Sequence, residues 1–99
     1  MTITRIFSVV IDPKLRSEFE TKFATISKDL LENEGGCCRI RLLKPTKWAP
    51  NEYAMISEWQ NEAALISFVG ENWNVSVIPT EMEKYAKTHT VSHYINVNE

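Results

Sequence analysis

The spacing of hydrophobic and polar residues in the first third of the chain predicts a strand followed by a long helix. Residues 2–11 are rich in Ile, Val, Phe and Thr and end at Asp12-Pro13, a pair that suits a helix cap and its first turn. Apolar residues then recur at steps of three and four, which places one stripe on a helix of about eighteen residues. The stripe consists of Leu15, Phe19, Phe23, Ile26 and Leu30, and the helix ends before Gly35-Gly36.

The pattern after these glycines predicts a hairpin, two further helical segments and a last strand. Residues 37–43 and 52–59 have strand-like patterns and are joined by the turn-rich segment 44–51, as in an antiparallel hairpin. Asn61 then caps a short helix, residues 62–69, that buries Leu65 and Phe68. A third helical stretch, kinked or restarted by Pro79, is predicted by the spacing of Val75, Ile78, Met82 and Tyr85. Residues 88–97 are the last strand.

This order of elements predicts a single α+β domain over residues 1–99. Strand, helix, strand, strand, helix, strand is the split βαββαβ arrangement of a ferredoxin-like fold, with a four-stranded antiparallel sheet and its helices on one face. We expect the other face to carry Tyr53, Met55 and Trp59, together with Ile3, Phe7, Val9 and Ile11 or the alternate residues of that strand. Because monomers rarely expose such a surface, we expect a second copy to cover it and form a homodimer.

Composition and charge exclude several kinds of partner. Eleven Lys and Arg residues against thirteen Asp and Glu give a formal charge of −2, and no stretch combines basic residues with aromatics as a nucleic-acid groove would. No run approaches the roughly 18–20 apolar residues of a membrane span, and no secretory signal is apparent, so we expect a cytoplasmic protein. The adjacent Cys37 and Cys38 point to opposite sides of a strand, and we expect them to be reduced.

Aromatic side chains and a histidine in the second half of the chain are candidates for a ligand site. An apolar cleft for a flat aromatic molecule, or alternatively a plain core, would be formed by Trp59, Phe68, Trp73 and Tyr85. His93 alternates with Val91 and Ile95 on the last strand. It is either a general base, since its ordinary pKa of about 6.5 suits that task, or a structural histidine.

Charged and metal-ligating residue types give weaker signals. His89 and His93 would lie about 13 Å apart along a strand, too far to share one ion, so we expect no metal site. Arg39 and Arg41 share one face of a strand, where they could hold an anionic substrate or pair with Glu52 or Glu58 across a dimer. The sequence lacks a nucleophile with its base, a phosphate-binding glycine loop and a set of zinc ligands, which argues against hydrolases, kinases and zinc enzymes.

The stretch Glu58-Trp59-Gln60-Asn61-Glu62-Ala63-Ala64-Leu65, together with the order of elements, resembles the antibiotic biosynthesis monooxygenase family. A second set of segments is similar to a bacterial subgroup of that family: residues 70–73, 77–79 and 81–85 and the pair His93-Tyr94. The resemblance covers nearly the whole chain. It implies a dimeric α+β barrel, a homodimer and a pocket between helices and sheet in each subunit.

The resemblance also implies an activity. Members of the family oxidise polycyclic phenols or quinols with molecular oxygen and without metal or flavin, whereas relatives in the superfamily bind and cleave haem. Trp59 matches the third-strand tryptophan of the aromatic oxygenases, while Met55 stands where they have an asparagine. Phe68 and Ile78 stand near the places of a tryptophan and a histidine that line the pocket of the haem-degrading relatives.

The resulting hypothesis is a cofactor-independent monooxygenase that acts on an electron-rich aromatic or quinol. A deprotonated phenol can pass an electron to oxygen directly, so the expected partners are a small aromatic molecule and molecular oxygen. The predicted catalytic residues are His93, as the base, and Trp59, and the predicted substrate-binding residues are Phe68, Trp73, Tyr85, Met55 and Arg41. Two alternatives remain: a non-catalytic module that binds a small ligand or is associated with stress, and a haem-binding or haem-degrading protein.

Overall fold

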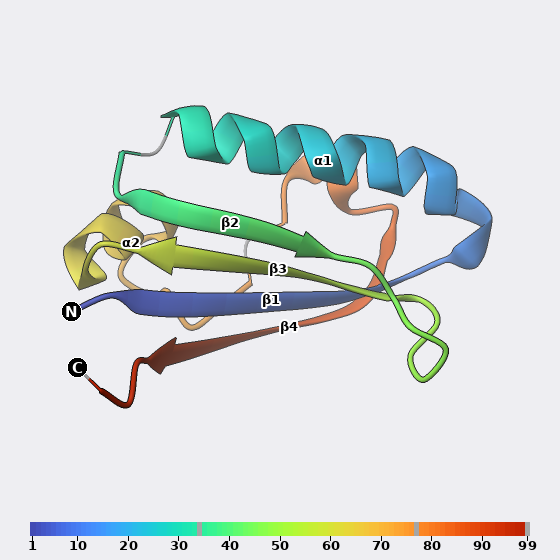
Figure 1. The fold of residues 1–99 in the computed structure, drawn as a ribbon. Helices are drawn as coiled ribbons and strands as arrows, with labels where there is room; N and C mark the ends of the chain where they lie inside the picture. Colours follow the sequence, from blue (N-terminus) through green and yellow to red (C-terminus); the bar gives the residue numbers. More distant parts are fainter. Residues whose placement is uncertain (34, 77, 99) are drawn as a thin grey trace.

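The four strands form one antiparallel sheet, as the element order predicts. The computed structural model describes residues 1–33, 35–76 and 78–98, without the side chains of Ser27, Leu30, Leu31 and Asn33. The elements are β1 (Ile3–Ile11), η1 (Pro13–Leu15), α1 (Arg16–Asn33), β2 (Cys37–Leu43), β3 (Glu52–Trp59), α2 (Glu62–Val69), η2 (Thr80–Met82) and β4 (Ala86–Ile95). The strand order β2-β3-β1-β4 confirms the ferredoxin-like fold (Figure 1). None of the described helices is both long and apolar enough to span a membrane.

The predicted apolar stripe places α1 on the sheet. The Asp12 carboxylate accepts a hydrogen bond from the Lys14 backbone N–H at 3.0 Å and caps η1, which leads into α1. On α1, Phe19 and Phe23 are buried and Ile26 is partly buried, as expected. The side chain of Leu30, the last residue of the predicted stripe, lies outside the described residues. The helix runs along the upper side of the sheet in Figure 1.

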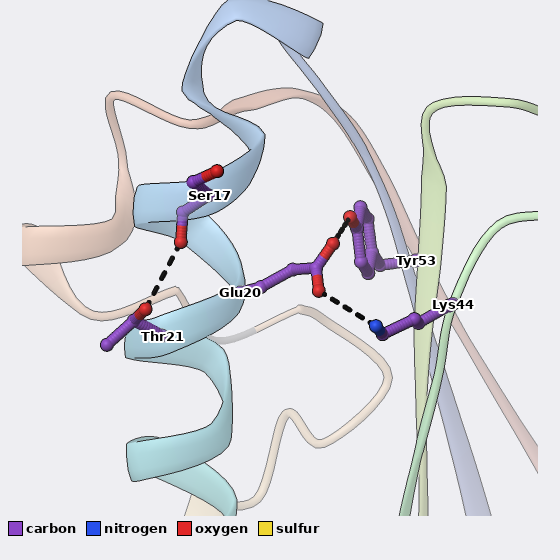
Figure 2. Close-up of polar contacts among 5 residues, drawn as sticks. All are labelled: Ser17, Glu20, Thr21, Lys44 and Tyr53. Atoms are coloured by element: carbon purple, nitrogen blue, oxygen red, sulfur yellow. Dashed lines mark hydrogen bonds and ion pairs between the residues drawn. The ribbon is translucent and has the colours of Figure 1, made fainter.

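A polar contact between α1 and the sheet adds to this packing. Figure 2 shows Glu20 of α1 reaching both Tyr53 of β3 and Lys44, which follows β2. The Tyr53 hydroxyl donates to Glu20 Oε2 at 2.5 Å, and Lys44 Nζ lies 3.2 Å from Oε1. These two bonds, the one from Tyr53 first, lower the pKa of the Glu20 carboxyl. On the same helix, the Thr21 hydroxyl donates to the Ser17 carbonyl oxygen one turn earlier.

The short helix α2 has the predicted bounds and closes one end of the sheet. Asn61 Oδ1 accepts from the Ala64 backbone N–H at 2.9 Å, and the helix ends at Gly70, whose φ of 90° favours glycine. Leu65 is fully buried in a cluster with Ile3, Cys37 and Trp59. This cluster anchors α2 to β1, β2 and β3.

The prediction of a third helical stretch, made from the spacing of apolar residues, is wrong. Among the described residues after Gly70, the only helical segment before β4 is the single turn η2. Pro79 explains this, because proline donates no backbone hydrogen bond and pushes the preceding residue, Ile78, away from helical angles. Met82 and Tyr85 are still buried, whereas Val75 is half-exposed. Val77, part of the family resemblance, lies outside the described residues.

The prediction that the large residues of the third strand lie on the open face of the sheet is also wrong. In the β1/β3 register, Val9 is opposite Tyr53, Phe7 is opposite Met55 and Ile3 is opposite Trp59. These residues belong to the clusters beneath the helices, where large aromatic side chains bury the most apolar surface. The open face of the sheet instead carries the alternate residues, which include Thr4, Ile6, Ser8, Val10, Ala54, Ile56 and Glu58.

The two cysteines differ in burial, and a β-bulge decides which one faces the core. The β2/β3 register shifts between Cys37 and Arg39, so Cys37 is opposite Trp59 and buried, whereas Cys38 is exposed. The alternation instead predicts that Cys38 shares a face with Ile40 and Leu42. The two cysteines do not form a disulfide.

Candidate functional site

A cavity of about 350 Å³ lies between the sheet and the elements that cover it. Its walls come from β1, β3, α1, α2, the connection to β4 and the first residue of β4, and they are apolar apart from two residues. The apolar lining consists of Phe7, Val9, Phe19, Phe23, Ile26, Met55, Phe68, Ile78, Pro79, Met82 and Ala86. This volume and lining are typical of a pocket for a small, mostly apolar molecule.

The two polar lining residues differ in their surroundings. Asp29 lies on α1 and is exposed. Arg5 is the third residue of β1, on the face beneath the helices, and only 4% of its surface is exposed. The buried polar group of the cavity is therefore a guanidinium.

Three neutral groups hold this guanidinium in place. Arg5 Nη1 donates to the Trp73 carbonyl oxygen at 2.7 Å and Nη2 donates to the Val75 carbonyl oxygen at 3.1 Å. Nη1 also lies 2.8 Å from Nε2 of His93. No carboxylate of the described residues forms an ion pair with Arg5. Burial lowers the pKa of the guanidinium, but arginine stays protonated in proteins, so this corner of the cavity holds a buried positive charge.

The contact with Arg5 fixes the protonation state of His93. A guanidinium only donates hydrogen bonds, so Nε2 of His93 must be the acceptor and the ring proton lies on Nδ1. Nδ1 is buried and has no hydrogen-bond partner among the described residues. The Trp73 ring meets the imidazole edge-on, with 4.6 Å between ring centroids. Burial first, and then the charge of Arg5, lower the pKa of His93, which favours the neutral imidazole.

Four of the predicted site residues meet at or beside the cavity. Met55 and Phe68 line it directly. Trp73 and His93 contact Arg5, which lines it. The structure therefore places Met55 and Phe68 on the cavity lining, and Trp73 and His93 outside it, against the buried cation that lines it.

Two predicted site residues lie in the core behind the cavity wall. Trp59 is fully buried, stacks on Phe68 with 5.0 Å between ring centroids, and donates from Nε1 to Ser57 Oγ at 3.0 Å. Tyr85 is also fully buried, and its hydroxyl donates to Glu18 Oε1 at 2.6 Å. Burial first, and then the bond to Glu18, raise the pKa of the Tyr85 hydroxyl. Neither side chain is part of the lining.

Arg41 lies on the opposite face of the sheet from the cavity. It is exposed and pairs in register with Ile56, whose neighbours Met55 and Ser57 point toward the helices. The geometry therefore separates Arg41 from the residues that line the cavity. Its neighbour Arg39 reaches Glu58 of the same chain, with 3.8 Å between Nε and Oε2.

The sequence interpretation missed Arg5, although the sequence contains a signal for it. Arg5 occupies the position between Ile3 and Phe7 in the alternation of β1, where all other residues on that face are apolar. A charged residue in the buried register of a strand needs polar partners, and this marks it as a candidate site residue.

His89 lies on the same side of β4 as His93 but is exposed. It stacks on Phe7, with 6.3 Å between ring centroids. The described residues contain no group of three or more His, Cys, Asp or Glu side chains that could hold a metal ion.

Comparison with solved structures shows the same fold in several bacterial proteins. SO0527 from Shewanella oneidensis superposes with a TM-score of 0.75 at 16% identity, over 94% of this chain and 88% of that one. A Bordetella bronchiseptica protein assigned to the antibiotic biosynthesis monooxygenases gives 0.69 at 23% identity, over 97% of both chains. The N63A mutant of SnoaB, a cofactor-independent oxygenase from Streptomyces nogalater, gives 0.74 at 17%, over 97% of this chain and 93% of that one. No curated protein matches the chain.

The family model for antibiotic biosynthesis monooxygenases matches residues 2–72. The matched range contains Arg5, Met55, Trp59 and Phe68 and ends just before Trp73. It covers well over half of the sequence, and the chain therefore belongs to the antibiotic biosynthesis monooxygenase family.

Proposed function

We propose that this protein is a monooxygenase that oxidises a flat, electron-rich aromatic or quinol bound in the cavity between α1 and the sheet. Membership of the family supports an oxygenase-type reaction. The observation that carries the choice of substrate is the cavity itself, about 350 Å³ with mostly aromatic and aliphatic walls, lined by one buried cation, Arg5, and by the exposed Asp29. His93 contacts this cavity through Arg5. Such walls favour a planar ring system over a sugar, whose hydroxyl groups would meet few polar partners.

The proposed reaction balances with the aromatic substrate and molecular oxygen alone. A phenolic hydroxyl loses its proton, and the phenolate passes one electron to oxygen to give superoxide and a phenoxyl radical. Recombination at a ring C–H carbon forms a peroxide anion, and return of the proton taken in the first step converts it into a hydroperoxide. Loss of water from this hydroperoxide leaves a quinone, so one oxygen atom enters the product and the other leaves as water.

His93 is the proposed base for the first step. Its neutral imidazole can take up a proton at Nε2, the atom that faces Arg5. Proton transfer therefore requires that the hydrogen bond between Arg5 and His93 opens when substrate enters. Phe68 and Met55 contact the ring system in this proposal, and Trp73 holds the imidazole in place. Trp59 and Tyr85 support the wall from behind.

Oxygen uptake and isotope incorporation test the reaction. With 1-naphthol and with 1,4-dihydroxynaphthalene as probes, we expect protein-dependent oxygen consumption above the rate of autoxidation. With 1-naphthol under ¹⁸O₂ we expect one labelled oxygen per quinone formed. Tight binding of both probes without oxygen uptake would instead support a non-catalytic ligand-binding module.

Filling the cavity tests where the reaction takes place. Ile78→Trp adds an indole to the cavity wall and should raise KM by at least about tenfold, because the ring system no longer fits. Val97→Trp is the matched control, since Val97 is 96% exposed and does not line the cavity. An unchanged KM in Ile78→Trp would place the substrate elsewhere.

A homodimer is the proposed assembly. The open face of the sheet carries half-buried Ile6 and Ile56 at paired positions, with Val10 and Ala54 further along the same strands. A second copy pressed against this face would remove these side chains from water. Trp48, in the loop between β2 and β3, is 85% exposed and would be buried by an interface that reaches this loop.

A further inference from the structure

We propose that Arg5 binds an anionic oxygen of the ligand, and that the molecule taken up by the cavity is therefore an aromatic acid, with either a carboxylate or an ionised hydroxyl on the ring. This inference rests on the proposed function in that it names the substrate class of the same cavity. The evidence for it is the environment of the Arg5 side chain.

The first step is the charge balance of Arg5. The residue is 96% buried and lines the cavity, and among the described residues it has only neutral acceptors: two backbone carbonyl oxygens and one imidazole nitrogen. The ion pairs of the described residues are made by Arg39, Lys44 and Lys84. A buried cation without a counter-charge is costly, and an anion from outside the chain would offset that cost.

The second step is the count of hydrogen-bond donors. A guanidinium has five N–H bonds, and the described contacts use two on Nη1 and one on Nη2. One N–H on Nη2 and the one on Nε remain for a ligand. Two donors on one guanidinium suit the two oxygens of a carboxylate, and a phenolate oxygen can accept from both.

The third step is how the guanidinium is held. Its partners come from two separate parts of the chain, the connection after α2 and the strand β4. They restrain the charge at the cavity wall, and the cost of ordering it is met before a ligand arrives. Asp29 is the other charged residue of the lining, but it is exposed on α1, where water screens its charge.

The shape of the cavity then selects among anions. Apart from Arg5 and Asp29 its lining is apolar, so a small inorganic anion would leave most of the volume and apolar surface unused. An aromatic acid meets both demands, with its ring against Phe68 and Met55 and its anionic oxygen against Arg5.

Matched pairs of probes test this proposal under anaerobic conditions, where no turnover interferes. The carboxylate arm compares 2-naphthoate with 2-naphthamide, which has the same shape and no charge. The phenolate arm compares 2,4-dinitro-1-naphtholate with its methyl ether. Binding is followed by calorimetry and by the NMR signal of the Trp73 indole N–H, and we expect each anion to bind at least about tenfold more tightly than its neutral partner.

Variants of Arg5 assign the preference to this residue. Arg5→Gln should abolish the preference for the anion while the neutral partners still bind, and Arg5→Lys should keep part of it. Lys14→Gln, which removes one exposed positive charge in η1, is the control for net charge and should leave the preference unchanged. If Arg5→Gln does not fold, the comparison of 2-naphthoate with 2-naphthamide in the wild-type protein still shows whether the cavity prefers an anion.

The proposal is overturned if neither acid binds, if acids and neutral partners bind equally to the wild type, or if the preference persists in Arg5→Gln. A preference in only one arm identifies which kind of anionic oxygen is recognised. Absence of oxygen uptake with 1-naphthol and 1,4-dihydroxynaphthalene, in a protein that prefers the anionic probes, would count against the monooxygenase function and leave the anion site standing. Oxygen uptake without any preference for anions would support the monooxygenase function and overturn the anion site.

Discussion

Nη1 of Arg5 lies 2.8 Å from Nε2 of His93, and Nδ1 on the other side of the imidazole is buried without a partner among the described residues. The imidazole can therefore act in two ways, as a base that takes a proton at Nε2 or as an acceptor that positions the guanidinium. The two roles predict different outcomes for conservative variants.

Replacing His93 with glutamine separates the two roles. If His93 is the base, both His93→Ala and His93→Gln should lower kcat for hydroquinone oxidation by at least about tenfold. If it only positions Arg5, glutamine can still accept the hydrogen bond through Oε1, and His93→Gln should retain most of the activity lost in His93→Ala. Stopped-flow oxygen consumption at saturating substrate distinguishes them. Wild-type rates in both variants would remove His93 from the mechanism.

The lowered pKa of His93 predicts a pH dependence of stability. The folded state favours the neutral imidazole, so at a given pH near 6 the unfolded chain binds more protons than the folded one. Stability from this group is complete above the ordinary pKa of about 6.5 and is lost as pH falls toward the lower pKa of the folded state. Urea unfolding between pH 5 and 8 should therefore show a loss on acidification that is smaller in His93→Gln. The exposed His89 supplies the control variant, His89→Gln. Parallel curves for wild type and His93→Gln would contradict the expectation.

The contact between Gly36 and α2 predicts a steric effect at one glycine only. A Cβ built on Gly36 would lie 2.3 Å from the Ala64 Cβ, whereas a Cβ on Gly35 has no atom within 4 Å. Gly36→Ala should lower the free energy of unfolding by about 1–3 kcal/mol, and Gly35→Ala should change it by less than about 0.5 kcal/mol. Ala64→Gly introduced beside Gly36→Ala should restore part of the loss. Equal urea midpoints for the two single variants would show that α2 moves away at little cost.

The open sheet face predicts the assembly state. If two copies pair through this face, the wild-type protein should sediment as a dimer at micromolar concentration, and Ile56→Asp should sediment as a monomer, because the carboxylate would be buried without a partner. Val97→Asp adds the same charge at a fully exposed position and should leave the dimer intact. Far-UV circular dichroism checks that each variant is folded. A wild-type protein that sediments as a monomer would contradict the proposal.

Local patterns predicted the elements well where capping and alternation agree. The bounds of β2, β3 and α2 follow from turn residues, strand alternation and the Asn61 cap, and all three are confirmed. The prediction of a third helix was wrong because Pro79 interrupts a spacing that is otherwise helical. Ile78, Met82 and Tyr85 reach the core through an irregular connection instead. The predicted orientation of Cys37 and Cys38 was wrong because the alternation of polar and apolar residues does not reveal a β-bulge.

The candidate site was only partly predictable, because two of its features depend on tertiary structure. Aromatic residues and His93 could be found by residue type, but which of them line a cavity depends on how α2 and the connection to β4 pack. Trp59 and Phe68 illustrate this, since only one of the two stacked rings faces the cavity. The alternation of β1 places Arg5 on the buried face, but its role depends on partners that lie 68 and 88 residues later in the chain.

Main-chain oxygen atoms, rather than side chains, provide two of the three acceptors for Arg5, at Trp73 and Val75. Any amino acid except one that disturbs the local path of the chain can supply such an oxygen. Substitutions at position 75 should therefore be well tolerated in a mutational scan, while insertions or deletions between α2 and η2 should not. Related proteins can preserve this pair of carbonyl acceptors with no recognisable signature in their sequences, so a search for it must compare backbone structures.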